Sequence, residues 1–211
     1  MPRLACGTAA GSLVVLDVAR GCVLAELAAH SAAVCGIEWC SLTTLLSWAR
    51  PTTAASGARN ELLLTDVRTG QSVAPRADRP HQQPIGAVRV SPLKQYFIVV
   101  FGDQPAELWA LASLTPLRTL PSTLPALTAL EWSPVHSARR RTGSGSETAP
   151  ADRALAKEHF VFTDQAGQMY HFSVEGNQVR DGTCIPADPG VGTVTGIGWK
   201  GDQVSLVIVG I

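Results

Sequence analysis

Three polar residues, His81, Asp103 and Trp109, could form one hydrogen-bonded network. An imidazole beside a carboxylate is an arrangement that general acid–base catalysis uses. The same residue types more often form buried structural networks, in which each polar group satisfies its neighbour. The sequence shows no further set of carboxylates or histidines that would complete an active site with these three residues. We therefore interpret them as a structural network, and we expect no catalytic residue.

Other candidate ligands and nucleophiles also lack partners at the required spacing. His159 and His171 are twelve residues apart, and neither has a second Cys or His at metal-ligand spacing. Cys35 and Cys40 are five apart and favour core thiols over a redox pair. We expect neither a metal nor a cofactor.

Two glycine-rich stretches resemble catalytic or nucleotide-binding loops only superficially. "GVGTVTG" at 190–196 has the wrong glycine spacing for a dinucleotide loop and leads into a strand pattern, not a helix. "GSGS" at 143–146 lacks the flanking strand and helix of a nucleophile elbow. Neither stretch supports a nucleotide-binding enzyme or a hydrolase.

A cluster of arginines precedes a hydroxyl in "RRRT" at 139–142. Such a stretch could be a phosphorylation site at Thr142 or a small anion-binding patch. The composition around it favours a solvated linker. Thr142 remains a possible phosphosite.

Composition excludes several classes of partner. The 211 residues are 45% hydrophobic, enough for one sizeable core or two small ones, and 17 basic residues balance 17 acidic ones. The chain therefore has no overall charge to attract nucleic acid or an anionic membrane. No apolar run reaches the ~18 residues of a membrane span, and a secretion signal is disfavoured, so we expect a soluble protein. Five cysteines without a C-x-x-C pair, and no Asn-x-Ser/Thr site, favour the cytoplasm.

A motif of a small residue, an aliphatic residue and tryptophan recurs along the chain. Trp39, Val90, Trp132 and Trp199 mark it, at steps of 51, 42 and 67 residues. A second set of runs keeps the same rhythm at 49, 44 and 63 residues: "GSLVVLDV", "NELLLTDV", "QPAELWAL" and "GQMYHFSV". A unit of about 40 to 45 residues with several short strands is typical of a WD40-type propeller blade.

The predicted fold is therefore all-β, an incomplete WD40-type β-propeller over residues 1–211. Three whole blades are expected at about 32–79, 84–120 and 126–185, with three strands of another blade before them and two strands after them. In the first whole blade we expect a turn-rich break at "RPTTAASGARN". The long last step predicts a flexible insertion at 136–156.

The blades deviate from the usual WD40 hydrogen-bonded network. That network combines a His, a Ser or Thr, an Asp and a Trp, and its best match here is His81, Asp103 and Trp109 without the hydroxyl. His30 and Asp164 lack the other members in their own units. Apolar packing should hold such blades together, with Trp39, Trp132 and Trp199 in the blade core.

Several long runs resemble the middle region of the large WD-repeat protein eleven family of animals. They cover nearly the whole chain: "NELLLTDVRTGQSVA", "SPLKQYFIVVFGDQPAELW", "LTALEWSP" and "EHFVFTDQAGQMYHFSVEGNQVRD". The resemblance implies part of the first of two propellers, or the junction between them. It also implies a non-enzymatic scaffold in a complex that tethers vesicles at the trans-Golgi network during endosome-to-Golgi transport. Links with Hedgehog signalling, cilia and the nucleus are implied in the same way.

Two other functions compete with the scaffold interpretation. A nuclear or chromatin-associated propeller would need a basic face, which the zero net charge and single arginine cluster disfavour. A propeller enzyme would need reactive groups gathered about the axis. We expect other proteins as partners, with no nucleic acid and no direct membrane insertion, and the remaining blades of a longer propeller to be needed.

Overall fold

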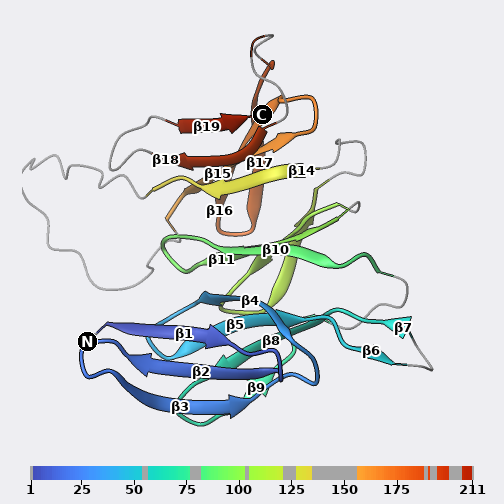
Figure 1. The fold of residues 1–211 in the computed structure, drawn as a ribbon. Helices are drawn as coiled ribbons and strands as arrows, with labels where there is room; N and C mark the ends of the chain where they lie inside the picture. The colour runs from blue at the N-terminus through green and yellow to red at the C-terminus, as the bar shows by residue number, and fades with distance from the viewer. Residues whose placement is uncertain are drawn as a thin grey trace, which may run out of the picture. The chain divides into compact units, whose positions relative to one another are not determined.

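The computed structural model of the chain consists of strands and turns throughout the residues it describes, and no helix occurs among them (Figure 1). Consequently, no helix that could cross a membrane exists in that part of the chain. The structure describes residues 2–53, 57–76, 82–102, 105–120, 127–134, 156–187, 190, 194–199 and 206–210.

The chain folds into two compact units. Unit 1 comprises Met1–Val90 and Tyr96–Thr123, and unit 2 comprises Ser91–Gln95 and Leu124–Ile211. The short segment Ser91–Gln95 therefore belongs to unit 2, although the residues on both sides of it belong to unit 1.

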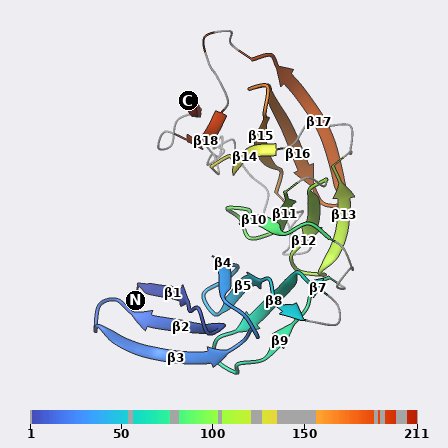
Figure 2. The same cartoon turned by 45° about the vertical axis from the view of Figure 1, so that its right-hand side comes forward.

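Unit 1 contains three larger antiparallel sheets, in which the strands follow one another in chain order, and one small two-stranded sheet (Figures 1 and 2). The first sheet is β1 (Arg3–Gly7), β2 (Ser12–Asp17) and β3 (Cys22–Ala28). The second is β4 (Val34–Trp39), β5 (Thr44–Ala49), β8 (Glu61–Asp66) and β9 (Ser72–Val73). The third is β10 (Ile85–Val90), β11 (Tyr96–Phe101), β12 (Glu107–Ala110) and β13 (Thr115–Thr119).

Unit 2 contains one four-stranded and one two-stranded antiparallel sheet. The former is β14 (Leu127–Trp132), β15 (Glu158–Asp164), β16 (Met169–Glu175) and β17 (Gln178–Ile185). The latter is β18 (Val194–Trp199) and β19 (Leu206–Gly210). Three strands, three whole four-stranded blades and two strands therefore follow one another, as predicted, and the all-β, incomplete propeller is confirmed.

One local prediction was incomplete. The break expected between the second and third strands of the first whole blade contains a short hairpin, β6 (Thr52–Thr53) and β7 (Gly57–Ala58). Two-residue strands carry no alternating pattern that a sequence could reveal. The predicted insertion at 136–156 falls almost wholly on 135–155, which lie outside the described residues, and it stays a prediction.

The sequence motif that ends at a tryptophan has a structural counterpart in the first strand of each blade. A β-bulge interrupts the pairing of that strand with the next one, five to three residues before the marker position. A bulge bends and twists its strand, and the same bend at the same place makes the units alike. The bulged pairs are Val34/Gly36, Ile85/Ala87, Leu127/Ala129 and Val194/Gly196.

The turn after the third strand of a blade is alike in the first two sheets. Asp17 and Asp66 end β2 and β8, and each backbone carbonyl accepts a hydrogen bond of 2.8 Å from a glycine N–H four residues on. Those glycines, Gly21 and Gly70, have φ of 65° and 73°, a left-handed conformation that a side chain disfavours. The Asp–Gly spacing therefore sets the reversal into the last strand.

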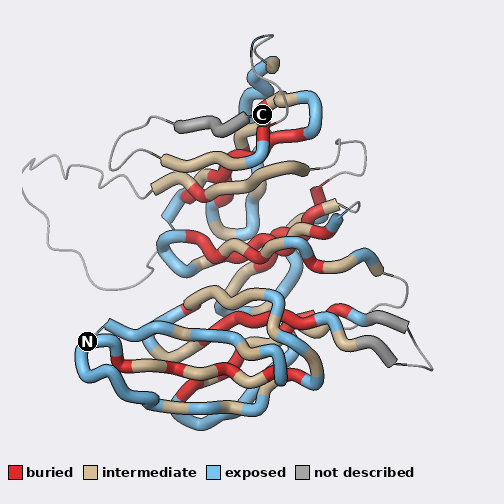
Figure 3. The backbone as a smooth tube through the Cα atoms, viewed as in Figure 1, coloured by how far each residue is buried: buried red, intermediate tan, exposed pale blue. Residues whose placement is uncertain are grey.

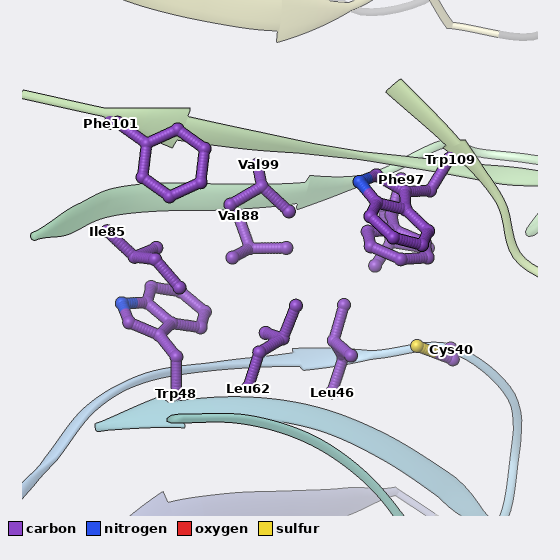
Figure 4. Packing of buried hydrophobic residues seen from close by; sticks show 11 residues of the cluster. Cys40, Leu46, Trp48, Leu62, Ile85, Val88, Phe97, Val99, Phe101 and Trp109 are labelled. Atoms are coloured by element: carbon purple, nitrogen blue, oxygen red, sulfur yellow. The ribbon is translucent and has the colours of Figure 1, made fainter. Parts of the chain in front are cut away.

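Apolar side chains at alternate strand positions are buried between neighbouring sheets. Buried and half-buried positions alternate along several strands (Figure 3). In β2, Leu13 and Val15 are buried while their neighbours Val14 and Leu16 are half-buried, and they pack with Leu45 of β5. On the other face of that second sheet, Leu46, Trp48 and further residues meet the third sheet (Figure 4). Each fully buried side chain of this kind contributes roughly 1.5–3 kcal/mol, so apolar packing is a large part of what holds the sheets of unit 1 together.

Candidate functional site

A serine, a histidine and a glutamate form one hydrogen-bonded chain in unit 1. His30, in the loop before β4, lies 2.8 Å by Nε2 from Ser47 Oγ of β5 and 2.9 Å by Nδ1 from Glu61 Oε2 at the start of β8. The order hydroxyl, imidazole, carboxylate is that of a nucleophilic triad. Ser47 is 0% exposed, however, so no substrate can reach its Oγ. The arrangement satisfies buried polar groups and ties three segments of the blade together.

A second buried network stands in the next blade. Arg76 Nε and Nη2 each donate to a carboxylate oxygen of Glu107, both at 3.0 Å. The Arg76 side chain is 4% exposed and that of Glu107 7%. Arg76 also donates to Gln82 Oε1 and lies with Cζ 5.1 Å from the ring centroid of Phe101. A bidentate pair with extra hydrogen bonds is the geometry in which a buried charge is tolerated.

Trp109 of the predicted structural network belongs to this second network. It is buried, and its indole Nε1 donates to Glu107 Oε2 at 3.1 Å. His81 and Asp103 lie outside the described residues, so the network of these three residues remains a prediction. The structure instead shows the indole in contact with a carboxylate two residues before it in β12.

The third whole blade carries a network built on Asp164, at the end of β15. Its Oδ1 accepts the backbone N–H of Gln168 at 2.9 Å, and its Oδ2 lies 3.1 Å from the hydroxyl of Tyr170. Burial, followed by the hydrogen bond to Asp164, raises the pKa of Tyr170 to about 12. The tyrosine thus supplies the donor that a tryptophan supplies in the blade before it.

Glu158, at the start of β15, accepts hydrogen bonds from a separate group of donors within unit 2. Its two carboxylate oxygens accept from Ser91 Oγ at 2.8 Å and from the backbone N–H of Leu93 at 3.0 Å. Gln95 Nε2 donates to it at 2.9 Å. Glu158 is 4% exposed, so these donors offset the loss of its hydration.

The three marker tryptophans differ in their surroundings. Trp132 is buried and lies 5.0 Å, centroid to centroid, from Phe160, while Trp39 is half-buried against the cluster around Leu13. The Nε1 of Trp199 is buried and has no hydrogen-bond partner in the part of the chain that the structure describes.

The remaining sequence candidates gather no reactive site among the described residues. His159 and His171 do come together, with Nδ1 and Nε2 at 3.0 Å. Cys40 is buried, as expected of a core thiol, whereas Cys35 is exposed and the expectation was wrong for it. No group of three or more possible metal ligands occurs in the described part of the chain. Thr142, the "GSGS" stretch and residues 191–193 of "GVGTVTG" lie outside it, while the end of "GVGTVTG" forms the start of β18, the strand expected there.

Sequence reasoning missed the carboxylates that organise the first two networks. Glu61 and Glu107 stand in the recurring runs "NELLLTDV" and "QPAELWAL", and neither they nor Arg76 were given a role. One signal was available, because His30–Glu61 and Arg76–Glu107 share a separation of 31 residues.

Comparison with known proteins identifies similar chains of much greater length. The chain is 42% identical to WD repeat-containing protein 11 of Mus musculus, 41% to that of Homo sapiens and 40% to that of Danio rerio, in each case over 97% of its own length. It spans only about a fifth of these relatives, 19–20% of their length.

A solved structure supports the same architecture. A chain described as "Crystal Structure of Mitotic Checkpoint Complex" has a TM-score of 0.63 to this one at 17% identity, covering 99% of this chain and 57% of that one. At that identity the likeness shows the fold alone.

The family is settled by a family model described as the WDR11 second β-propeller, which matches residues 1–188. The expected position in the first propeller, or at the junction, is therefore wrong. The resemblance itself is confirmed: the chain belongs to the WDR11 second β-propeller family.

Proposed function

We propose that this chain is a protein-interaction module of a scaffold that works in a vesicle-tethering complex at the trans-Golgi network, in endosome-to-Golgi transport. Membership of the WDR11 family, with 40–42% identity over 97% of the chain, carries the proposal. The WD40 propeller is generally a scaffold that binds other proteins, and the matched solved structure comes from a protein complex. The tethering role is what the family resemblance implies.

The polar groups of the described residues support a scaffold without catalysis. The chain of Ser47, His30 and Glu61 is sealed from solvent at its hydroxyl. The carboxylates of Glu107 and Glu158 are buried against donors that use their oxygens. Buried side chains with these hydrogen bonds stabilise the blades. Binding of other proteins would then fall to the exposed strands and turns.

The outer strands provide such a surface. β3 in unit 1 and β17 in unit 2 are the last strands of their sheets, and most of their residues are exposed. An edge strand presents unpaired backbone groups and alternating side chains, which other proteins can contact. We propose trafficking-complex subunits as partners, with the remaining blades of a longer propeller completing the surface.

The proposed location is the cytoplasm, peripheral to the trans-Golgi network and its vesicles, with further roles in Hedgehog and ciliary signalling and in the nucleus. These follow from the family resemblance. Zero net charge is consistent with partners that are proteins and not nucleic acid.

The test is affinity capture from cells in which the tagged protein carries either Glu107→Ala or Asp66→Asn. Glu107 is buried in an ion pair, whereas Asp66 pairs with Arg68 at an exposed turn. We expect vesicle-tethering proteins with the wild type and Asp66→Asn, and their loss with Glu107→Ala. Capture of chromatin proteins in their place, unaffected by Asp66→Asn, would contradict the proposal and favour the nuclear alternative.

A further inference from the structure

Two imidazoles face each other across β15 and β16 in unit 2. His159 Nδ1 and His171 Nε2 are 3.0 Å apart, and the ring planes differ by 7°. In the register, His159 lies opposite Ser173 and His171 opposite Val161, so the two histidines are diagonal neighbours on one face of the sheet. The nitrogen separation is a hydrogen-bond length, so one ring donates an N–H to the other.

The ring of His171 is held closely from the neighbouring strand. A Cβ placed on Gly182 of β17 would lie 2.5 Å from His171 Nδ1 and 2.6 Å from its carbonyl oxygen. Only glycine leaves room for the ring there. The position of the imidazole is therefore fixed by the backbone of β17 as well as by its own strand.

A shared proton explains this pair better than a metal ion does. A metal ion would need both facing nitrogens free of protons and further ligands around it, whereas a separation of 3.0 Å is that of a direct N–H···N hydrogen bond. No third ligand completes a site among the described residues.

Charged groups on the same face set the electrostatics. Alternation places Lys157 of the segment before β15, Glu131 of β14, Glu175 of β16 and Arg180 of β17 on this face, while the described residues of β18 include no titratable group. Burial, and then the charge of Lys157, lowers the pKa of His171 below its usual 6.5.

We propose that His159 and His171 form a pH-sensitive latch between β15 and β16. With both rings neutral, one facing nitrogen donates and the other accepts. One proton taken from solvent leaves a charged N–H facing a bare nitrogen, and the bond persists. A second proton places an N–H on both facing nitrogens, so the bond breaks and two positive charges repel.

The direction of the effect follows from linkage. Because the pKa of His171 is lower in the folded state, the unfolded chain binds more protons once the pH falls below about 6.5. Stability contributed by the pair is therefore present above that pH and is lost as the pH falls toward the lowered folded value. Opening of the latch should loosen β15 against β16, the two strands that it joins.

The first test needs no variant. Imidazole nitrogen resonances of the full chain are followed by NMR from about pH 8 to pH 5, spanning the usual histidine range. We expect the resonances of His159 and His171 to shift together in two coupled steps, the second below the usual range. Independent single-step titrations, each with an ordinary midpoint, would overturn the proposal.

The second test is a double-mutant cycle with His159→Phe, His171→Phe and the double variant, read as unfolding constants. Near pH 8, we expect the effects of the two substitutions on the unfolding constant to be coupled by a factor of about five. Near pH 5, this factor should fall to about one, which means no coupling. His136→Phe is the matched control, since it removes a histidine outside this pair, and it should leave the coupling unchanged. The same coupling at both pH values, or none near pH 8, would overturn the latch.

Discussion

Arg76 and Glu107 form a two-pronged ion pair, both bonds 3.0 Å long, in which neither side chain is more than 7% exposed. Glu107 also takes the indole N–H of Trp109. The pair thus joins the segment that enters a blade to the third strand of that blade, and it orients a core aromatic residue at the same time.

The preceding blade has the same arrangement, with a histidine in place of the arginine. His30 and Glu61 are 31 residues apart, as are Arg76 and Glu107, and Ser47 takes the second ring nitrogen of His30. A basic residue before the blade and a glutamate at its third strand therefore recur in step with the repeat. Both blades thus link the segment before the blade to its third strand, although the residue that contacts the glutamate differs.

Replacing Glu107 by Ala should be strongly destabilising. The substitution leaves the guanidinium of Arg76 buried without its partner, and breaking a buried pair in this way costs about 3–5 kcal/mol. Urea denaturation of the variant measures the loss. The double variant Arg76→Met/Glu107→Leu should recover much of it, because no buried charge is then left alone.

Asp66→Asn is the control for that experiment. It breaks a carboxylate–guanidinium pair with Arg68 at an exposed turn, and the urea midpoint should not change measurably. Equal effects of Glu107→Ala and Asp66→Asn would contradict a buried structural role for Glu107.

Leu46 and Leu42 offer a matched pair of leucines in the same blade. Leu46 is 0% exposed inside the cluster between two sheets, and Leu42 is 87% exposed in the turn before β5. Leu46→Ala should cost about 2–5 kcal/mol, whereas Leu42→Ala should change the unfolding free energy by less than about 0.5 kcal/mol. Similar values for the two variants would contradict the packing of these sheets.

Gly36 should tolerate no side chain. A Cβ there would lie 2.1 Å from Cζ2 of Trp48, which packs across the bulge. Gly36→Ala should shift the indole, red-shift or quench the tryptophan fluorescence and lower the thermal midpoint. Gly196 occupies the matching position of a later repeat, and no described atom lies within 4 Å of a Cβ built on it, so Gly196→Ala should leave both signals near wild type.

Tyr170 should ionise late and report on folding at high pH. Its pKa of about 12 exceeds the usual tyrosine value of 10.0, so the unfolded chain releases this proton first as the pH rises. The stability it contributes is therefore complete below about pH 10 and is lost as the pH approaches 12. Ultraviolet difference titration should place this ionisation earlier in Asp164→Asn, though still above the ordinary value, since burial is the largest cause.

Ser47 should be unreactive despite the imidazole beside it. A fluorophosphonate probe labels activated serines, but Oγ of Ser47 belongs to a fully buried residue. We expect no labelling of Ser47 in the folded chain by mass spectrometry. Labelling that disappears in Ser47→Ala and in His30→Gln would show an accessible nucleophile and contradict the non-enzymatic proposal.

The sequence predicted the blades well because three kinds of local signal recur along the chain, although the blade of β10–β13 has Val90 at the tryptophan position and no Asp–Gly pair in the turn after β12. Alternating apolar residues such as Leu13 and Val15 define a strand, Asp and Gly at fixed spacing define the turn after it, and the recurring tryptophan marks the first strand. Each of these signals is local, so one repeat can be compared with the next.

The polar networks were harder to predict because their members are far apart in the chain. The partner of Arg76 lies 31 residues away, and Glu158 collects donors from a turn more than sixty residues before it. Neither distance is fixed by a strand or helix period. Only a comparison of separations between blades could have suggested the glutamates.

An experimentally determined structure of the chain tests the central claim most directly. We predict that β4, β5, β8 and β9 superpose on β10–β13, with a bulge beside Gly36 in one sheet and beside Gly86 in the other, and with Leu46 facing the sheet of β10–β13. Helices between parallel strands, or a one-residue register shift that turns Leu46 away from that sheet, would contradict the account.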